Sequence, residues 1–488
     1  MNRKMIAYLL GRVLIAEFFL MIPSVIVGII YGESATLSFI LPMLLLAACG
    51  LIFGLKKPSD TTLYVREGFF VVAASWIFMS LIGALPFYIS SFDFFGGASQ
   101  FSSPIDCIFE MISGFTTTGA TICTSPESLP KCLLFWRSFS HWVGGMGVLV
   151  FVLAIMPMSD SMHLMKAEVP GPVVGKLVPK MRQTARILYT FYAALTVLLA
   201  ILLIAGKMPV FDALCNAFGT AGTGGFSVRD AGISYYNSAY VEIVLSIFML
   251  IFGINFNLFY FILIKKAKEA FKSEELRTYL MIVLTATLVI AANVYHSYSS
   301  VGESLRYSFF QVTSIISTSG YGTADFANLW PTLSQTILVM LIIFGGCAGS
   351  TAGGLKISRV MLLLKTFAQE MKRLLHPRSV TTVRLEGSPV DNAIVRSTLV
   401  YFVMYVFIIA VSTLLLSIDT FGDFTTNFTA ALTCVNNVGP GLGKIGPMDN
   451  LSGFSPFSKV VLSLDMLLGR LEIFPIIVFF SPGSWKKN

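Results

Sequence analysis

The sequence predicts an all-α integral membrane protein with ten transmembrane helices: an N-terminal helix pair followed by four pseudo-fourfold repeats around one central pore. Three observations predict this class. Hydrophobic residues make up 55% of the 488 residues, whereas charged residues make up only 12%. Apolar stretches long enough to cross a bilayer recur along the whole chain. Between some of these stretches lie four short glycine-containing segments that resemble one another, which indicates an internal repeat.

The predicted spans are windows of about 20 largely apolar residues, the length that crosses the hydrocarbon core as a helix. The first window contains Arg12 and Glu17 and has no small-residue cleavage site, so it is interpreted as a helix and not as a signal peptide. The predicted spans cover residues 5–30, 36–55, 67–91, 132–157, 187–206, 239–264, 278–295, 331–364, 392–418 and 457–481.

Positive charge predicts which side of the membrane each loop faces, because loops rich in Lys and Arg remain cytoplasmic. Most of the 34 Lys and Arg residues fall in alternate loops of the ten-span arrangement, which places both termini in the cytoplasm. Topology and anionic lipid headgroups therefore explain the net charge of +8, and no motif supports nucleic-acid binding. The basic segments are residues 2–4, 56–66, 166–186, 265–277, 365–384 and 486–487.

The seven cysteines and four histidines show no spacing that is typical of a metal site. Cys123 and Cys132 fall in one predicted outer loop. They could form a disulfide or remain free thiols, and the sequence leaves both alternatives open.

Four semi-polar segments are too short to cross the membrane, so they are predicted to be re-entrant helices that each end in a glycine loop. Alignment on the loop glycines places a Thr or Asn two residues earlier in every copy, at Thr117, Thr223, Thr318 and Asn437. Three of the short helices carry a polar residue at one equivalent position, where Glu110, Asn216, Gln311 and Ala430 stand. The loops read SGFTTTGATIC (113–123), GTAGTGGFSV (219–228), IISTSGYGTADF (315–326) and TCVNNVGPGLG (433–443), with the aligned glycines at Gly119, Gly225, Gly320 and Gly439.

Each repeat is predicted as a span, a short helix, a glycine loop and a second span, and four parallel copies can surround one axis normal to the membrane. Non-helical backbone at membrane depth is tolerated only where it is buried in protein or lines a water-filled path. Glycine permits backbone angles that aim carbonyl oxygens inward, and rings of such carbonyls replace the hydration shell of potassium. The negative C-terminal ends of the short helices would also favour a cation on this axis.

These loops, in this order and spacing, resemble those of the Trk/Ktr/HKT superfamily of potassium transporters, and the chain is most similar to the bacterial TrkH-type membrane subunits. The resemblance covers the whole chain. It implies a helix pair at 1–57 and repeats at 58–165, 166–272, 273–385 and 386–488. It also implies a potassium filter made of Thr116, Thr117, Gly119, Thr223, Gly225, Thr318, Ser319, Gly320, Asn437, Val438 and Gly439.

Other interpretations of the glycines are weaker. The loops depart from the TVGYG of tetrameric potassium channels, and only STSGYG comes close. The glycines could merely let helices pack closely, but GGMG at 144–147 is a better candidate for that role. A nucleotide-binding interpretation of GTAGTGG would need a preceding strand and a soluble domain, and neither is predicted.

The eighth span is interrupted by GGCAGSTAGGLK at 345–356. Each glycine costs about 1 kcal/mol of helix preference, so this run predicts a loop at membrane depth. The resemblance implies that this loop lies beneath the filter and gates the path, whereas the alternative is a passive kink. The predicted gate residues are Gly345, Gly346, Gly349, Gly353, Gly354 and Lys356.

The last span carries Asp465, Arg470 and Glu472 in apolar surroundings. Charge near the bilayer centre is costly and marks a pathway or a paired site. The resemblance implies that Arg470 projects into the cavity below the filter and opposes cations there. The alternative is a structural ion pair of Arg470 with Glu472 or Asp465.

The resemblance implies potassium uptake across the bacterial inner membrane by a homodimer that binds a TrkA-type cytoplasmic ring of nucleotide-binding subunits. The membrane potential could drive uptake with about 2.3 kcal/mol per charge per 100 mV. Channel-like transport and proton-coupled symport both stay open. A sodium-permeable or sodium-coupled relative is an alternative, although glycine at all four filter positions argues against it. A membrane-embedded enzyme would need clustered polar catalytic residues, which the sequence does not show.

Overall fold

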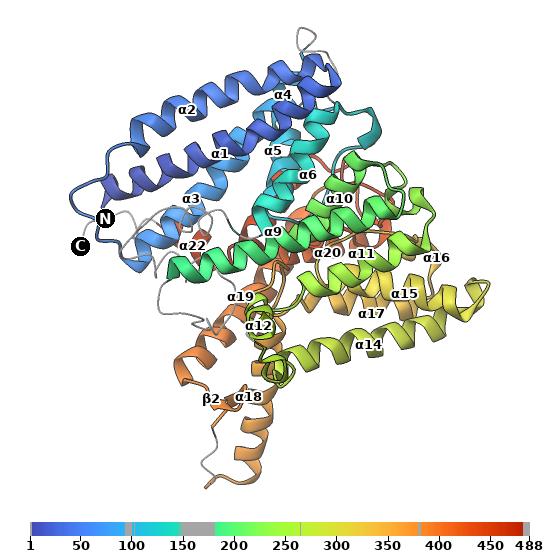
Figure 1. Cartoon of the computed structure of the whole chain (residues 1–488). Helices are drawn as coiled ribbons and strands as arrows, with labels where there is room; N and C mark the ends of the chain where they lie inside the picture. Colours follow the sequence, from blue (N-terminus) through green and yellow to red (C-terminus); the bar gives the residue numbers. More distant parts are fainter. Residues whose placement is uncertain are drawn as a thin grey trace.

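The computed structural model describes residues 2–92, 100–145 except 102, 147, 181–378 except 264, and 382–481, and most of these residues are helical (Figure 1). Six helices in this part of the chain are long and apolar enough to span a membrane, or seven if one bent pair counts as a span. The all-α membrane class is therefore confirmed. The end of the predicted span 132–157, much of the basic segment 166–186 and all of 486–487 lie outside the described residues.

The N-terminal pair consists of α1 (Arg3–Tyr31) and α2 (Ile40–Gly54), which lie side by side at one edge of the molecule (Figure 1). The 3-10 helix η1 (Ser34–Phe39) joins them. A Cβ atom at Gly11 would lie 2.5 Å from the backbone nitrogen of Gly54, so only glycine permits this approach. The small residues bring the two helix backbones together, as is typical of helices packed within membranes.

The same order of helices recurs four times after this pair. The first helices are α3 (Val65–Gly83), α9 (Met181–Ala205), α14 (Glu274–Val294) and α19 (Asn392–Leu416). The short pore helices are α5 (Pro104–Phe115), α10 (Val210–Gly222), α15 (Val301–Ile316) and α20 (Phe424–Asn436). The second helices are α6 (Lys131–Gly145), α11 (Ala239–Phe252), α17 (Thr332–Ile343) and α21 (Pro456–Arg470).

Local chemistry fixes where the pore helices begin. The Asp423 carboxylate accepts a hydrogen bond from the Thr426 N–H at 2.8 Å, and the Ser300 hydroxyl accepts one from the Glu303 N–H at 3.2 Å. Such caps satisfy backbone donors that the first helical turn leaves without partners. Pro104 stands at the first position of α5, where its missing N–H costs nothing.

All four second helices are too short to cross a bilayer, with 15, 14, 12 and 15 residues. The sequence predicted this only for the third repeat. The predicted spans at 239–264 and 457–481 are each interrupted by a break that the sequence did not predict. The chain bends by 96° between α11 and α12 (Phe256–Leu263), and it breaks again between α21 and α22 (Phe474–Phe480).

The physical reason for the break after α11 lies in another repeat. The Cys347 N–H donates to the Gly253 carbonyl at 2.9 Å, and the Phe256 N–H donates to the Gly349 carbonyl at 3.1 Å. Backbone groups freed by the two breaks thus satisfy each other, which the bilayer core requires. The break after α21 has left-handed backbone at Glu472 and Ile473, with φ of 55° and 68°.

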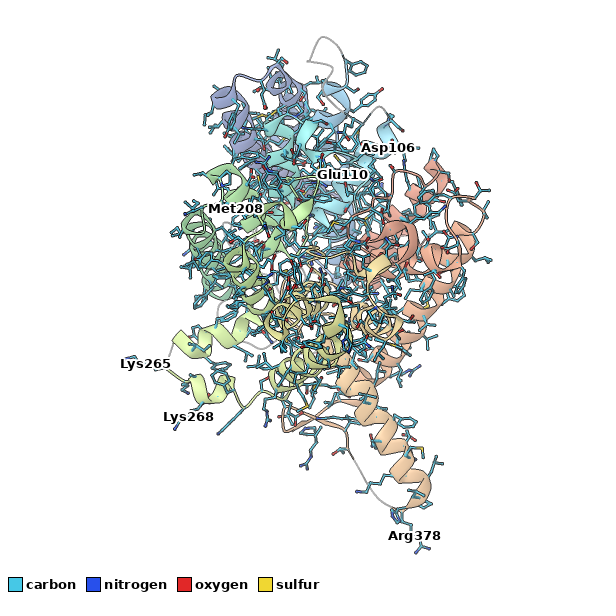
Figure 2. All side chains as sticks on the ribbon, turned by 90° about the vertical axis from the view of Figure 1, so that its right-hand side faces the viewer. Asp106, Glu110, Met208, Lys265, Lys268 and Arg378 are labelled. Atoms are coloured by element: carbon cyan, nitrogen blue, oxygen red, sulfur yellow. The ribbon has the colours of Figure 1, made fainter. Side chains whose placement is uncertain are left out.

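The third repeat continues after its break as α18 (Ile357–Leu375), which extends away from the helical body (Figure 1). A two-stranded antiparallel hairpin, β1 (Arg384–Leu385) with β2 (Ser388–Pro389), packs against it. Lys265, Lys268 and Arg378 lie toward this same end, whereas Asp106 lies toward the other (Figure 2). The remaining short elements are α4 (Leu85–Ser90), α13 (Ala267–Ala270), α16 (Phe326–Leu329), η3 (Pro126–Ser128), η4 (Gly232–Tyr236), η5 (Tyr295–Ser297) and η6 (Gly443–Ile445).

Cys123 and Cys132 are both buried free thiols, so the disulfide alternative is not realised. Burial raises the pKa of the Cys123 thiol to about 12. The thiol therefore stays protonated near neutral pH, which makes it a poor nucleophile for disulfide exchange.

Candidate functional site

The four pore helices end in the same backbone motif. Thr117, Thr223, Thr318 and Asn437 have left-handed backbone, with φ of 56°, 57°, 59° and 54°. In each copy the next N–H donates to the carbonyl five residues earlier, at 3.0, 2.8, 2.8 and 3.0 Å in chain order. This is the Schellman motif, which usually takes glycine at the left-handed position. A non-glycine residue there costs on the order of 1–3 kcal/mol, so its fourfold recurrence indicates a functional constraint.

Two residues later, the ring glycines Gly119, Gly225, Gly320 and Gly439 are also left-handed, with φ of 74°, 75°, 75° and 96°. Each one lies against a carbonyl of the next repeat. A Cβ atom on Gly119 would overlap the Gly224 oxygen, one on Gly225 the Ser319 oxygen, and one on Gly320 the Val438 oxygen. A Cβ atom on Gly439 would lie 2.8 Å from the Thr118 oxygen, which closes the circle.

These contacts run from repeat to repeat and return to the first, so the four loops meet in a closed circle. We call Thr118, Gly224, Ser319 and Val438 the carbonyl ring. Ser319 and Val438 were predicted from the sequence, whereas Thr118 and Gly224 were not. Their constant place, directly before each ring glycine, could have identified them.

A small cavity of about 110 Å³ touches all four ring glycines, which confirms that they face one space. Arg137, Asp230 and Asp449 also line it. The cavity lies toward the loops that follow the ring glycines. It therefore forms a mouth to the ring on the side of Thr121 and Ser227.

Thr116 is not part of the carbonyl ring. Its hydroxyl donates to the Ile112 carbonyl at 2.6 Å and lies 2.8 Å from the Thr118 hydroxyl. The Ser319 hydroxyl likewise lies 2.9 Å from that of Ser317, so these side chains face the helix ends.

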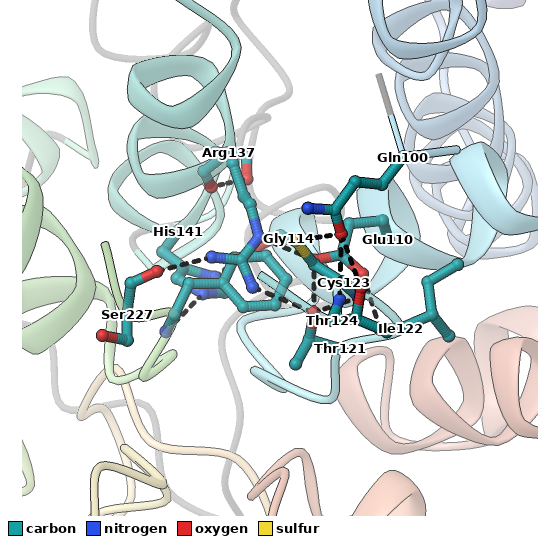
Figure 3. Close-up of polar contacts among 12 residues, drawn as sticks. Gln100, Glu110, Gly114, Thr121, Ile122, Cys123, Thr124, Arg137, His141 and Ser227 are labelled. Atoms are coloured by element: carbon teal, nitrogen blue, oxygen red, sulfur yellow. Dashed lines mark hydrogen bonds and ion pairs between the residues drawn. The ribbon is translucent and has the colours of Figure 1, made fainter. Parts of the chain in front are cut away.

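The equivalent position in the four short helices, where Glu110, Asn216, Gln311 and Ala430 stand, lies near the chain segment that follows each ring glycine. In two of the four repeats its side chain binds that segment. The Glu110 carboxylate accepts from the Ile122 N–H at 3.0 Å (Figure 3). With its amide oxygen toward the loop, Gln311 accepts from the equivalent Thr323 N–H at 3.0 Å. Ala430 cannot do this, and the neighbouring Thr429 hydroxyl accepts from the Leu442 N–H at 3.1 Å instead. Asn216 departs from the pattern, because its amide lies 3.4 Å from the Tyr236 hydroxyl.

Helix α6 joins the first repeat to the second through Arg137 and His141, both buried (Figure 3). Arg137 pairs with Glu110 at 2.6 Å and donates to the Ser227 carbonyl at 2.8 Å. His141 accepts at Nε2 from the Phe226 N–H at 3.2 Å, so Nδ1 carries the hydrogen that it donates to the Gly114 carbonyl at 2.8 Å. Neither residue was predicted from the sequence, although polar groups inside an apolar span were a signal.

We expect Glu110→Gln to destabilise the protein strongly, because Arg137 would keep its charge while losing a fully buried carboxylate partner. Breaking such a pair costs about 3–5 kcal/mol. Glu127→Gln is the control, because its contact with Arg229 is longer, at 3.8 Å, and partly exposed, so its loss costs about 1 kcal/mol or less. Thermal unfolding in detergent measures both. Equal melting temperatures for the two variants would contradict the role given to Glu110.

The chain between α17 and α18 forms the predicted loop at the break, and its two ends meet where the Gly345 N–H donates to the Leu355 carbonyl at 3.0 Å. The Gly353 N–H donates to the Thr318 hydroxyl at 2.7 Å. A Cβ atom on Gly353 would lie 2.6 Å from the Asn436 carbonyl, so the loop packs directly against the pore-helix ends of repeats three and four.

The other predicted gate residues shape this loop. Gly349 and Gly354 have φ of 73° and 69°. A Cβ atom on Gly346 would lie 2.8 Å from that of Ala352, and one on Gly345 would overlap the Gly353 oxygen. Lys356 is buried, and its ammonium group donates to the carbonyls of Ala352 and Gly353.

Glu275, which was not predicted from the sequence, holds the loop at Ala348 and also binds the start of α18. Its buried carboxylate accepts from the Ala348 N–H at 2.7 Å and from the Ser358 N–H at 3.0 Å. Glu386 of the hairpin in turn accepts from the Glu274 and Glu275 N–H groups at 3.0 and 3.1 Å. Hydrogen bonds thus connect the hairpin to the loop through the start of α14.

Arg470 ends α21 and joins the loop to the first repeat. Its guanidinium donates to the Thr351 carbonyl at 2.8 Å and to the Gly145 carbonyl at 2.9 Å. A cation at the C-terminal end of α6 is favourable, because that end carries partial negative charge. The carboxylates named in the ion-pair alternative have other partners: Glu472 pairs with Arg359, and Asp465 accepts from the Ser412 hydroxyl at 2.7 Å.

Gly144 and Gly145 fit the packing role predicted for GGMG. A Cβ atom on Gly144 would overlap the Phe115 carbonyl, and one on Gly145 would lie 2.6 Å from the Tyr192 hydroxyl. The absence of side chains lets α6 lie against the end of the first pore helix.

Comparisons with known proteins identify the family and the fold. A family described as "TrkH: Cation transport protein" matches residues 38–487. The chain is 34% identical, over the full length of both proteins, to the Trk system potassium uptake protein TrkH of Salmonella typhimurium and to that of Escherichia coli. It is 33% identical to TrkG of Escherichia coli over 96% of this chain and 95% of that protein. The fold matches the crystal structure of the potassium transporter TrkH from Vibrio parahaemolyticus with a TM-score of 0.88 and 32% identity, covering 100% of both chains.

Proposed function

This chain belongs to the TrkH family of cation transport proteins, and from that premise we propose that it takes up potassium through a filter formed by the carbonyl ring. It is a multi-pass membrane transporter and not an enzyme. One observation carries the proposal: each ring glycine lies against a ring carbonyl of the next repeat, and the four contacts form a closed circle.

The chemistry of the ring suits a weakly hydrated monovalent cation. Four backbone oxygens can replace water around potassium, and no charged side chain contributes to the ring itself. The four pore helices end just before the ring, so their partial negative charges favour a cation at the axis. The resident ion is the transported substrate, and its passage breaks and forms no covalent bond.

The 344–356 loop is proposed as the gate and Arg470 as a positive barrier on the cytoplasmic side of the ring. The hydrogen bond from Gly353 to Thr318 supports the first assignment, because it places the loop directly beneath the third pore-helix end. The hydrogen bond from Arg470 to Thr351 supports the second, since it holds the guanidinium beside this same loop.

We expect Arg470→Ala to raise cation flux, because the variant removes a positive charge beside the path and releases Thr351. An increase of about tenfold corresponds to 1.4 kcal/mol of barrier. Arg359→Ala is the control, because it breaks the ion pair with Glu472 without removing Arg470. Potassium flux in proteoliposomes and thermal unfolding are measured together. Unchanged flux with severe unfolding in Arg470→Ala would favour a purely structural role.

We further propose that the protein lies in the bacterial inner membrane with both termini in the cytoplasm, as a homodimer regulated by a TrkA-type nucleotide-binding ring. The relatives are named as parts of a Trk system, which supports partner subunits in general. The end of the molecule that carries Lys265, Lys268, Arg378 and the β1–β2 hairpin is the proposed cytoplasmic face (Figure 2).

Growth of a potassium-uptake-deficient bacterial strain tests the function. Expression of the chain with the ring subunits should restore growth at low potassium, and reconstituted vesicles should take up potassium faster than sodium. Failure to restore growth by an inserted protein would contradict potassium uptake. Equal or faster sodium uptake would favour the sodium-permeable alternative, and loss of uptake on collapse of the proton gradient alone would indicate symport.

A further inference from the structure

Thr318 differs from the residues at the equivalent position of the other repeats. Its hydroxyl accepts a hydrogen bond from the Gly353 N–H of the 344–356 loop at 2.7 Å. The Thr223 hydroxyl instead donates to the neighbouring Gly222 carbonyl at 2.6 Å, and the Thr117 hydroxyl has no partner among the described residues. The Asn437 amide donates to the Thr118 hydroxyl and to the Met466 carbonyl, both at 2.9 Å. Among the described residues, the loop therefore forms a hydrogen bond with the third of these four equivalent side chains and with none of the other three.

We propose that Thr318 couples the gate to the filter, a proposal that rests on the proposed function. The Thr318 hydroxyl holds the 344–356 loop closed, and release of the loop changes the orientation of the adjacent Ser319 carbonyl in the ring. Thr318 is separated from this carbonyl by a single peptide unit. Thr318 and Ser319 donate their N–H groups to Ile315 and Ser314 at 3.0 and 2.8 Å, which ties both residues to the helix end. A force on the Thr318 side chain thus acts on the backbone that orients a ring oxygen.

The hydroxyl can serve both states of the loop. It offers one donor and two lone pairs, and only one lone pair is used by Gly353. When the loop leaves, that lone pair becomes available to water or to an ion at the inner end of the ring. Thr318 is β-branched and held in left-handed backbone, so few rotamers are open to it and the exchange of partners needs no side-chain rearrangement.

Gly353 also touches the fourth repeat, which extends the coupling across one repeat boundary. A Cβ atom on Gly353 would lie 2.8 Å from that of Asn437, and one on Gly354 would lie 3.1 Å from the Asn436 side-chain oxygen. The loop backbone therefore wedges between the third and fourth pore-helix ends. Its departure would loosen this side of the ring and leave the Thr117 and Thr223 side in place.

The test compares Thr318→Val, which keeps the shape but removes the hydroxyl, with Thr117→Val and Thr223→Val. Among the described residues, the hydroxyls at these two equivalent positions form no hydrogen bond with the loop. Two readouts are taken on the full chain in proteoliposomes: potassium flux over a range of potassium concentrations, and the modification rate of Cys347 by a thiol reagent. Cys347 is a buried free thiol inside the loop and reports its release, while Cys215, buried in α10 of the second repeat, serves as the internal reference. Mass spectrometry assigns the modified residue.

Thr318→Val leaves the buried Gly353 N–H without its acceptor, so loop release and Cys347 modification should rise about tenfold. The potassium concentration for half-maximal flux should change as well. Thr318→Ser keeps the hydroxyl and should restore both values, whereas Thr117→Val and Thr223→Val should leave Cys347 modification at the wild-type rate. Thr318→Ala provides a second hydroxyl-free variant if the valine variant does not insert.

Wild-type Cys347 modification in the hydroxyl-free Thr318 variants, with potassium flux intact, would overturn the coupling and leave the proposed function standing. An equal rise in Thr318→Ser would overturn it too, because the hydroxyl would then not be the contact that matters. Absence of potassium flux from the wild-type chain would instead contradict the proposed function itself.

Discussion

Gly225→Ala is expected to lose most of its potassium flux while still inserting into the membrane. The new Cβ atom would overlap the Ser319 oxygen, so this ring carbonyl would have to turn away from the axis. Left-handed backbone also disfavours alanine. Even about 1.4 kcal/mol of lost stabilisation for the permeating ion lowers flux about tenfold. Gly119→Ala and Gly320→Ala should behave in the same way, because their Cβ atoms would overlap the Gly224 and Val438 oxygens.

Gly387→Ala is the matched control for these variants. Gly387 has φ of 74°, so alanine there suffers the same backbone strain, but nothing lies within 4 Å of its Cβ position. Proteoliposome flux of potassium and sodium, corrected for the amount of inserted protein, measures the effect. Wild-type flux and selectivity in all the ring variants would remove the carbonyl ring from the pathway.

Shortening the loop between Gly349 and Gly353 is expected to raise basal potassium flux and to weaken the response to the cytoplasmic ring subunits. A shortened loop cannot keep both the Gly353 contact with Thr318 and the Thr351 contact with Arg470, so the closed arrangement loses its main hydrogen bonds. A partner can act on a gate only by shifting the balance between two loop arrangements. The filter lies outside the deleted residues, so potassium should still be preferred over sodium.

Flux with and without the ring subunits, for wild type and shortened loop, decides between a gate and a passive kink. The kink alternative predicts damaged folding or untouched regulation. Equal basal flux with an undiminished response to the ring subunits would leave the break as a packing feature.

Much of the fold could be predicted because the bilayer imposes long apolar helices, and the glycine loops repeat in order. The break at 345–356 was visible because glycines are concentrated there. The break after Phe252 was not, since the segment around Gly253 and Asn255 is otherwise apolar. Its cause is tertiary: the freed Gly253 carbonyl is satisfied by Cys347, almost a hundred residues away in the sequence.

The candidate site could likewise be predicted only in part. The ring glycines could be predicted because side-chain identity matters there. Thr118 and Gly224 contribute backbone oxygens, which any residue could supply, so their types gave no signal. Glu275 binds backbone N–H groups more than seventy residues later in its own repeat, and His141 binds the backbone of the second repeat. Such pairings depend on a fold that a single sequence does not reveal.

The most direct measurement is anomalous diffraction from crystals grown in rubidium or thallium, which substitute for potassium and scatter anomalously. We expect an ion peak among the carbonyl oxygens of Thr118, Gly224, Ser319 and Val438, and loss of that peak in Gly225→Ala. A transport-competent protein whose ions bind elsewhere, with no peak inside the ring, would contradict the carbonyl ring as the potassium filter.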